Sequence, residues 1–120
     1  MVTILQIGYD ECLLKTRALL LGRCGYRVIS TLGNGIAFGV ASAEKVDLVV
    51  IGHCAPTGIR ENAASHFKDH FPDIPIIALR PDSLHGNLQC ADYNSSVEDP
   101  QEWLKVVAKA ASRCKSISAD

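Results

Sequence analysis

The sequence has no marked excess of charge of either sign and no long apolar run. Its 12 Lys and Arg residues nearly balance 13 Asp and Glu residues, which gives a formal net charge of −1. Proteins that bind nucleic acids or anionic membranes normally carry a basic surface, so both classes of partner are disfavoured. No apolar stretch approaches the roughly 18 residues that cross a membrane, and no basic leader precedes Val2 and Ile4. We therefore expect a cytoplasmic protein.

The cysteines show no pattern of a disulfide framework or of a zinc ribbon. They number five, an odd count, and no two form a C-x-x-C pair. Both features disfavour cross-linking and structural zinc. Most of them lie within apolar segments, so we expect them to be buried as small hydrophobic residues. The five are Cys12, Cys24, Cys54, Cys90 and Cys114.

The composition is that of one folded domain. The chain has 120 residues, of which 48% are hydrophobic and 21% are charged, and this length is too short for two independent cores. Short β-branched runs alternate with longer segments of helical period, which is typical of βαβ units around a parallel sheet. Five such rounds fit within residues 1–114, followed by a polar tail at 115–120. The sequence therefore predicts an α/β fold with a doubly wound, five-stranded parallel sheet.

Local signals place the elements along the chain. Asp10 and Asp99 stand where helix N-caps belong, and Gly25 stands where a helix needs a left-handed C-cap. A third helix is expected over residues 61–71. About eleven residues separate the fourth strand from the fifth, so the helix between them should be short or irregular. The expected strands are residues 4–7, 26–31, 46–51, 74–79 and 91–94, with 46–51 in the middle of the sheet.

These features resemble the receiver domain of bacterial two-component response regulators, over almost the whole chain. The segments that carry the resemblance are residues 25–28, 47–51, 74–79, 91–93 and 99–102, together with Pro56. The resemblance implies a flavodoxin-like (βα)5 receiver fold with a shortened fourth helix. It also implies a role in phosphorelay signal transduction.

The resemblance locates the family's chemistry at positions that lack the family's residues. A receiver accepts a phosphoryl group on an aspartate after its third strand, and this aspartate holds Mg²⁺ together with an acidic pair after the first strand. Gly52 stands at the acceptor position, and Gly8 and Tyr9 stand at the acidic pair, with Asp10 as the remaining carboxylate. The resemblance therefore implies a pseudo-receiver that is not phosphorylated, binds no Mg²⁺ and needs no cofactor.

Three further positions complete the comparison with the family. Arg80 replaces the hydroxyl residue that follows the fourth strand, and Ser96 replaces the lysine that follows the fifth. Tyr93 matches the aromatic residue that moves when a receiver is activated. Without a phosphorylation input, we expect it to be an ordinary, partly buried tyrosine.

Two functions are compatible with this pattern. The first is a signalling module without enzymatic activity that acts through contacts with a protein partner, either another signalling protein or a second copy. The alternative is a small-ligand or anion sensor, because the pocket at the carboxyl ends of the strands has lost its carboxylates and gained the guanidinium of Arg80. A simpler possibility is that Tyr9 fills this space and that Arg80 pairs with Asp10 or Asp82.

Histidine and cysteine form two weaker constellations. His66 and His70 are four residues apart and can share one face of a helix, which zinc would accept. Cys54 could act as a nucleophile with His53 or His85 as its base. Neighbours in an extended segment point to opposite sides, so His53 is expected to be poorly placed to activate Cys54. We expect neither a metal site nor an enzyme.

Overall fold

The computed structural model describes residues 1–82 and 87–118, with side chains as far as residue 113. All the strands are parallel and form one five-stranded sheet in the order β2-β1-β3-β4-β5. The strands are β1 (Thr3–Gly8), β2 (Arg27–Leu32), β3 (Leu48–Ile51), β4 (Ile76–Arg80) and β5 (Tyr93–Ser96), and the helices are α1 (Glu11–Arg23), α2 (Asn34–Ala43), α3 (Thr57–His70) and α4 (Pro100–Ser118). The predicted α/β class and the central place of β3 are confirmed.

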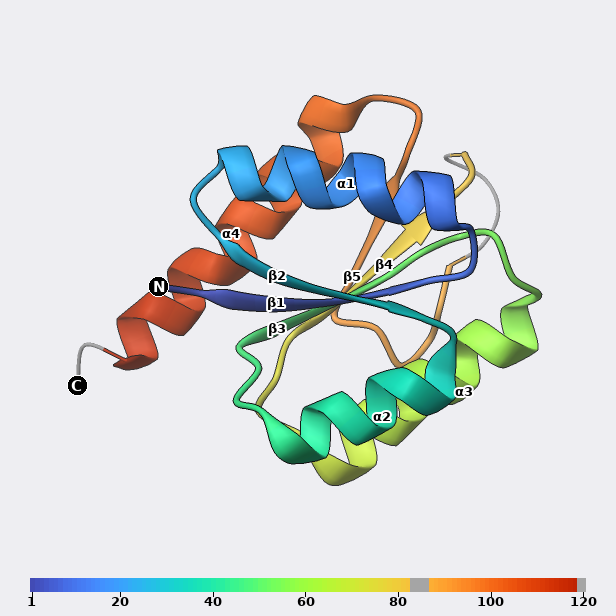
Figure 1. Ribbon diagram of the computed structural model, residues 1–120, viewed down its shortest axis with the longest axis horizontal. Coiled ribbons are helices and arrows are strands. Elements are labelled where there is room, and N and C mark those ends of the chain that lie inside the picture. Colours follow the sequence, from blue (N-terminus) through green and yellow to red (C-terminus); the bar gives the residue numbers. More distant parts are fainter. Residues whose placement is uncertain (83–86, 119–120) are drawn as a thin grey trace.

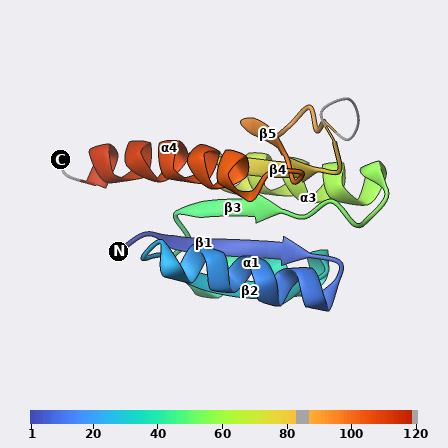
Figure 2. The same ribbon diagram turned by 90° about the horizontal axis from the view of Figure 1, so that it is seen from above.

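The helices cover both faces of the sheet. α1 and α4 lie on one face, and α2 and α3 lie on the other (Figure 1). Alternate residues of β1 supply the two apolar cores, because successive strand side chains point to opposite faces. Leu5 and Ile7 pack with Phe67 of α3, whereas Ile4 packs with Trp103 of α4. The amino end of β1 and the carboxyl end of α4 lie at one end of the sheet, and the strands end at the other (Figure 2).

The predicted helix caps are present. The carboxylate of Asp10 accepts a hydrogen bond from the Leu13 N–H at 3.1 Å. Gly25 has a φ of +91°, the left-handed conformation that favours glycine. Asp99 accepts from the Gln101 N–H at 3.0 Å. The helix that it caps runs through the predicted boundary at 114, so residues 115–118 continue the helix.

The connection between β4 and β5, where a short or irregular helix is predicted, lies partly outside the described residues, at 83–86. Its described parts, residues 81–82 and 87–92, contain no helix. The Glu61 carboxylate of α3 accepts hydrogen bonds from the backbone N–H groups of Gln89 at 3.0 Å and Cys90 at 2.9 Å. Backbone N–H groups need a hydrogen-bond partner, and here the Glu61 side chain supplies it. The connection is thereby held against α3.

The cysteines are not buried as expected. Cys12, Cys24 and Cys54 are exposed and Cys90 is partly exposed, while the Cys114 side chain lies outside the described part of the chain. Cys12 is next to apolar residues in the sequence but lies on the solvent-exposed side of α1, since only one face of an amphipathic helix is buried.

None of the helices in the described residues is long and apolar enough to cross a membrane.

Candidate functional site

The predicted site residues other than Tyr93 lie at the edge where the parallel strands end. Gly8 is the last residue of β1, Gly52 directly follows β3, and Arg80 and Ser96 are the last residues of β4 and β5. This edge is the usual ligand-binding edge of an open parallel sheet. The side chains around it fall into separate groups.

Leu14 fills the space beside Gly8. A Cβ built on Gly8 would lie 2.3 Å from Leu14 Cδ2, much closer than real Cβ atoms approach another atom. Leu14 comes from the first turns of α1 and is itself buried. A side chain at position 8 would therefore require Leu14 to move.

A guanidinium group lies beside Gly52. Arg17 of α1 is only 6% exposed, and its Nη1 lies 3.0 Å from the position that a Cβ at Gly52 would take. Burial lowers the pKa of Arg17, although the nearby Cys54 and Asp10 act in the opposite direction. A cation thus stands next to the position at which the resemblance puts the acceptor carboxylate.

Arg17 orients the histidine that follows Gly52. Its Nη2 donates a hydrogen bond to His53 Nδ1 at 2.9 Å. Because a guanidinium can only donate, His53 is neutral in this arrangement and carries its proton on Nε2. Burial lowers the pKa of His53, and the Arg17 and Arg60 cations lower it further.

His53 also contacts its neighbour Cys54, contrary to the expectation from extended geometry. Nε2 lies 3.6 Å from the Cys54 Sγ. The two residues lie in the loop after β3, outside any strand, so the alternation of side chains along a strand does not apply to them. His85, the other candidate base, lies outside the described residues.

A second arginine fixes the ends of two strands. Arg60 of α3 is 2% exposed. Its Nε donates to the Gly52 carbonyl at 2.8 Å, and its Nη2 donates to the Leu79 carbonyl. Burial lowers the pKa of Arg60, opposed by Tyr9 and Glu61. Arg60 therefore stabilises the backbone at the carboxyl ends of β3 and β4.

Tyr9 and Asp10 both have structural roles. The Tyr9 hydroxyl donates to Asn34 Oδ1 at 2.7 Å, and Asn34 Nδ2 donates in turn to the Ile59 carbonyl at 2.9 Å. Tyr9 thus connects the end of β1 with α2 and α3, and burial raises its pKa. Asp10 is exposed and caps α1.

Arg80 and Ser96 form a different group from Gly52. The nearest side-chain atom to a Cβ built at Gly52 belongs to Arg17, not to Arg80. Arg80 donates from Nη1 to Asn87 Oδ1, and the Ser96 hydroxyl accepts from the Glu98 N–H at 3.2 Å. Both residues line a hollow of about 330 Å³ with Asn94, Ser95, Glu98, Asp99, Glu102 and Val106. The guanidinium nearest to a side chain at position 52 is therefore that of Arg17, and Arg80 lines this other hollow.

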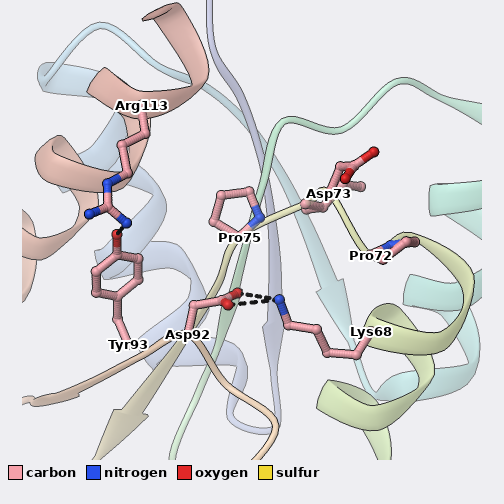
Figure 3. A pocket seen from close by; sticks show the side chains of 8 residues that line it. Lys68, Pro72, Asp73, Pro75, Asp92, Tyr93 and Arg113 are labelled. Atoms are coloured by element: carbon pink, nitrogen blue, oxygen red, sulfur yellow. Dashed lines mark hydrogen bonds and ion pairs between the residues drawn. The ribbon is translucent and has the colours of Figure 1, made fainter. Parts of the chain in front are cut away.

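Tyr93 lies at the amino ends of β4 and β5, next to a hollow of about 130 Å³ (Figure 3). Its hydroxyl accepts a hydrogen bond from Arg113 Nη1 at 2.8 Å. Across the hollow, Lys68 Nζ lies 2.6 Å and 2.7 Å from the two carboxylate oxygens of Asp92. Tyr93 is partly buried, as expected, and its contact with Arg113 ties it to α4.

The helical histidine pair forms an aromatic stack. The His66 and His70 ring centroids are 4.2 Å apart, and His66 also stacks on Phe38 at 3.7 Å. Burial and the neighbouring His70 lower the pKa of His66. Among the residues that the structure describes, no group of three or more His, Cys, Asp or Glu could hold a metal ion.

Arg17 and Arg60 are the site residues that the sequence prediction missed. Arg17 carried a signal, because it falls on the same helical stripe as Leu14 and Leu21, which are buried. Arg60 carried none, because it precedes the predicted start of the third helix at 61, whereas α3 begins at Thr57.

No protein-family model matches the sequence, and no curated protein is similar to it. Solved structures of receiver domains do match. The response regulator TrrA of Thermotoga maritima, solved with Mg²⁺ and BeF, has a TM-score of 0.79 at 20% identity, covering 91% of this chain and 97% of TrrA. A CheY-like receiver domain of Methanospirillum hungatei has a TM-score of 0.83 at 15% identity, covering 97% and 98%. A receiver domain of Clostridium thermocellum has a TM-score of 0.82 at 18% identity, covering 98% and 99%. The likeness establishes the receiver fold, as predicted.

Proposed function

We propose that this chain is a receiver-like signalling module that acts through protein contacts and without aspartyl phosphorylation. The observation that carries the proposal is the Arg17 guanidinium beside Gly52. Glycine has no nucleophile, and Nη1 lies 3.0 Å from the place where a side chain at position 52 would begin. The proposal includes the absence of enzymatic activity.

The residues at this edge do not fit Mg²⁺. The ion needs several oxygen ligands, usually including carboxylates. Leu14 occupies the space beside Gly8, and Arg17 places a positive charge beside Gly52. The nearby carboxylate, Asp10, caps α1 through the Leu13 N–H. A cation would therefore be repelled by Arg17 without gaining a set of anionic ligands.

A protein partner is the simplest role for a receiver fold that has lost this chemistry, because an interaction surface can persist when a site is lost. The fold itself is known in such contacts. The receiver protein TrrA has been solved in complex with the histidine kinase ThkA, and TrrA in that complex matches this chain with a TM-score of 0.81 at 19% identity. For this chain we propose a signalling protein or a second copy as the partner.

Amide NMR spectra test the proposal directly. Mg²⁺ with beryllofluoride mimics an aspartyl phosphate, and we expect it to cause no specific shift in this protein. A phosphorylatable receiver treated identically shows that the reagent is active. A second measurement is the intact mass after incubation with acetyl phosphate and Mg²⁺. Saturable shifts around Gly52, or a mass increase of one phosphoryl group, would show that the proposal is wrong.

The protein-contact part is tested separately. Partner capture by the immobilised chain, and self-association by analytical ultracentrifugation, should be the same with and without beryllofluoride. Contacts that appear only with the phosphate mimic would contradict independence from phosphorylation. If the chain remains monomeric and captures no signalling protein, the proposal of a protein partner is wrong.

A second candidate function is the sensing of a small anion. The observation that favours it is again Arg17, since the ion pairs of the described residues join Lys or Arg to carboxylates elsewhere and none includes Arg17. A buried cation without a carboxylate partner is a natural binding group for an anion.

A further inference from the structure

Among the described residues, no carboxylate forms an ion pair with the buried Arg17, although Asp10 is near enough to raise its pKa. Its one hydrogen-bond partner among the described residues is the neutral ring of His53. Buried ions are normally paired with an opposite charge, because removal from water costs several kcal/mol per ion. A ligand with one negative charge would supply the missing partner.

Arg17 and His53 also line a hollow of about 340 Å³ between α1 and the start of α4. We call it the α1–α4 hollow. The two helices lie on the same face of the sheet (Figure 1). The rest of its lining is mostly apolar and includes Leu13, Leu20, Val97 and Trp103. Its volume is in the range of sites for small molecules, which also combine apolar walls with few polar groups.

The geometry points to a small organic acid as the ligand of the α1–α4 hollow, with its carboxylate on Arg17 and its apolar body between Leu20 and Trp103. The inference rests on the second candidate function, the sensing of an anion, and adds the site and the class of ligand. A guanidinium suits a carboxylate because both are planar and can form two parallel hydrogen bonds. The apolar walls favour an organic body over a fully hydrated inorganic ion.

His53 adds a second donor at the charged end of the hollow. Its Nδ1 is taken by Arg17, so its proton is on Nε2. That atom lies 3.6 Å from Cys54 Sγ, a weak contact that a carboxylate oxygen could replace. Arg17 is the one charged residue in the described lining of the hollow, which matches a monoanion better than a dianion.

NMR titration of the whole chain tests this inference with four probes. These are indole-3-acetate and phenylacetate, the neutral amide phenylacetamide, and inorganic phosphate. We expect saturable shifts of the Leu13 and Leu20 amides and of the Trp103 indole with both acids. Because the amide lacks the charge, it should bind at least tenfold more weakly than phenylacetate. Equal binding of acid and amide would overturn the role of Arg17.

Variants on α1 separate the charge from the walls. Arg17→Met should weaken phenylacetate binding at least tenfold, whereas Arg23→Met, which removes the same charge from an exposed position of α1, should change it less than twofold. If both variants weaken phenylacetate binding equally, the effect is due to the net charge of the protein, and the proposed site is wrong. Should Arg17→Met fail to fold, Arg17→Lys keeps the charge but loses the planar fork, and it should still weaken the acid severalfold.

Leu20→Trp fills part of the α1–α4 hollow with a larger apolar side chain and keeps the charge of Arg17. It should weaken both organic acids and leave any binding of phosphate unchanged. If phosphate binding depends on Arg17 and the organic acids bind no more tightly than phosphate, the anion-sensing function stands but the hollow is not the site of an organic acid. No binding of any of the anions would refute both.

Discussion

Replacing Gly8 by alanine tests whether Leu14 fills the space at the end of β1. The new Cβ would lie 2.3 Å from Leu14 Cδ2 and 2.4 Å from its Cγ. Leu14 is 5% exposed, so it has little room to move. Overpacking of this kind costs about 1 to 3 kcal/mol, partly offset by the roughly 0.4 to 1 kcal/mol that alanine contributes through the unfolded chain. We expect Gly8→Ala to lower the free energy of unfolding by about 1 to 2 kcal/mol.

A double-mutant cycle with Leu14→Ala identifies the cause. Alone, this truncation of a buried leucine should cost about 2 to 5 kcal/mol, because it leaves a cavity. In the double variant, the methyl group at position 8 enters the space that the leucine has left. The clash is then relieved and the cavity becomes smaller. The double variant should therefore be more stable than the sum of the two losses predicts, by about 1 to 3 kcal/mol.

Urea denaturation followed by circular dichroism measures these differences. With a slope of about 1 to 3 kcal/mol per molar urea, the loss expected for Gly8→Ala moves the midpoint by roughly 1 M. The matched control is Gly39→Ala in α2, where a built Cβ meets no atom within 4 Å. That change should stabilise the helix by up to about 1 kcal/mol. Additive losses in the cycle, or equal stability of the two alanine variants, would refute the packing argument.

Three further predictions concern other parts of the carboxyl edge. Burial and the neighbouring cations hold the pKa of His53 below 6.5 in the folded chain, so the unfolded chain binds the proton first as the pH falls. The free energy of unfolding should therefore decrease below about pH 6.5. Urea titrations at several pH values measure this decrease, which His53→Asn should make smaller. Glu61→Gln keeps one acceptor oxygen for two N–H groups, so hydrogen exchange at residues 89–90 should become severalfold faster; unchanged exchange would mean that the carboxylate does not hold this connection. Tyr9→Phe removes the donor to Asn34 Oδ1 and should lower the free energy of unfolding by about 1 kcal/mol; a variant as stable as the parent chain in urea would contradict that bond.

The fold could be predicted because its signals are local. Asp10, Gly25 and Asp99 each mark a helix end through hydrogen bonds or a backbone conformation within a few residues. The alternation of apolar strands and helical segments then leaves few topologies, since parallel crossovers are right-handed. The β4–β5 connection was not predictable in the same way. Glu61 holds it from 28 and 29 residues away along the chain, and no local pattern reports such a contact.

The glycines of the site could be predicted, but what surrounds them could not. Gly8 and Gly52 were identified by their places at the carboxyl ends of strands, which are fixed by the fold. The groups that fill their surroundings come from helices, where a charged residue is normally expected to face solvent. Arg60 contradicts this expectation because its long side chain reaches the carbonyls of two strand ends and satisfies them. Only the three-dimensional arrangement shows that Arg60 is buried, whereas the helical stripe of Leu14 and Leu21 is a sequence signal for the burial of Arg17.

One helix, α1, packs against both glycines of the carboxyl edge. Leu14 and Arg17 are three residues apart on α1, so they lie on the same face of the helix and point toward the ends of β1 and β3. The absence of side chains at positions 8 and 52 and the presence of Leu14 and Arg17 are therefore linked by packing. An aspartate introduced at position 52 alone would lie against the Arg17 guanidinium and form an ion pair with it. Mg²⁺ would then have to compete with the buried Arg17 cation for that carboxylate. The charge of this pocket therefore depends on α1 as much as on the strands.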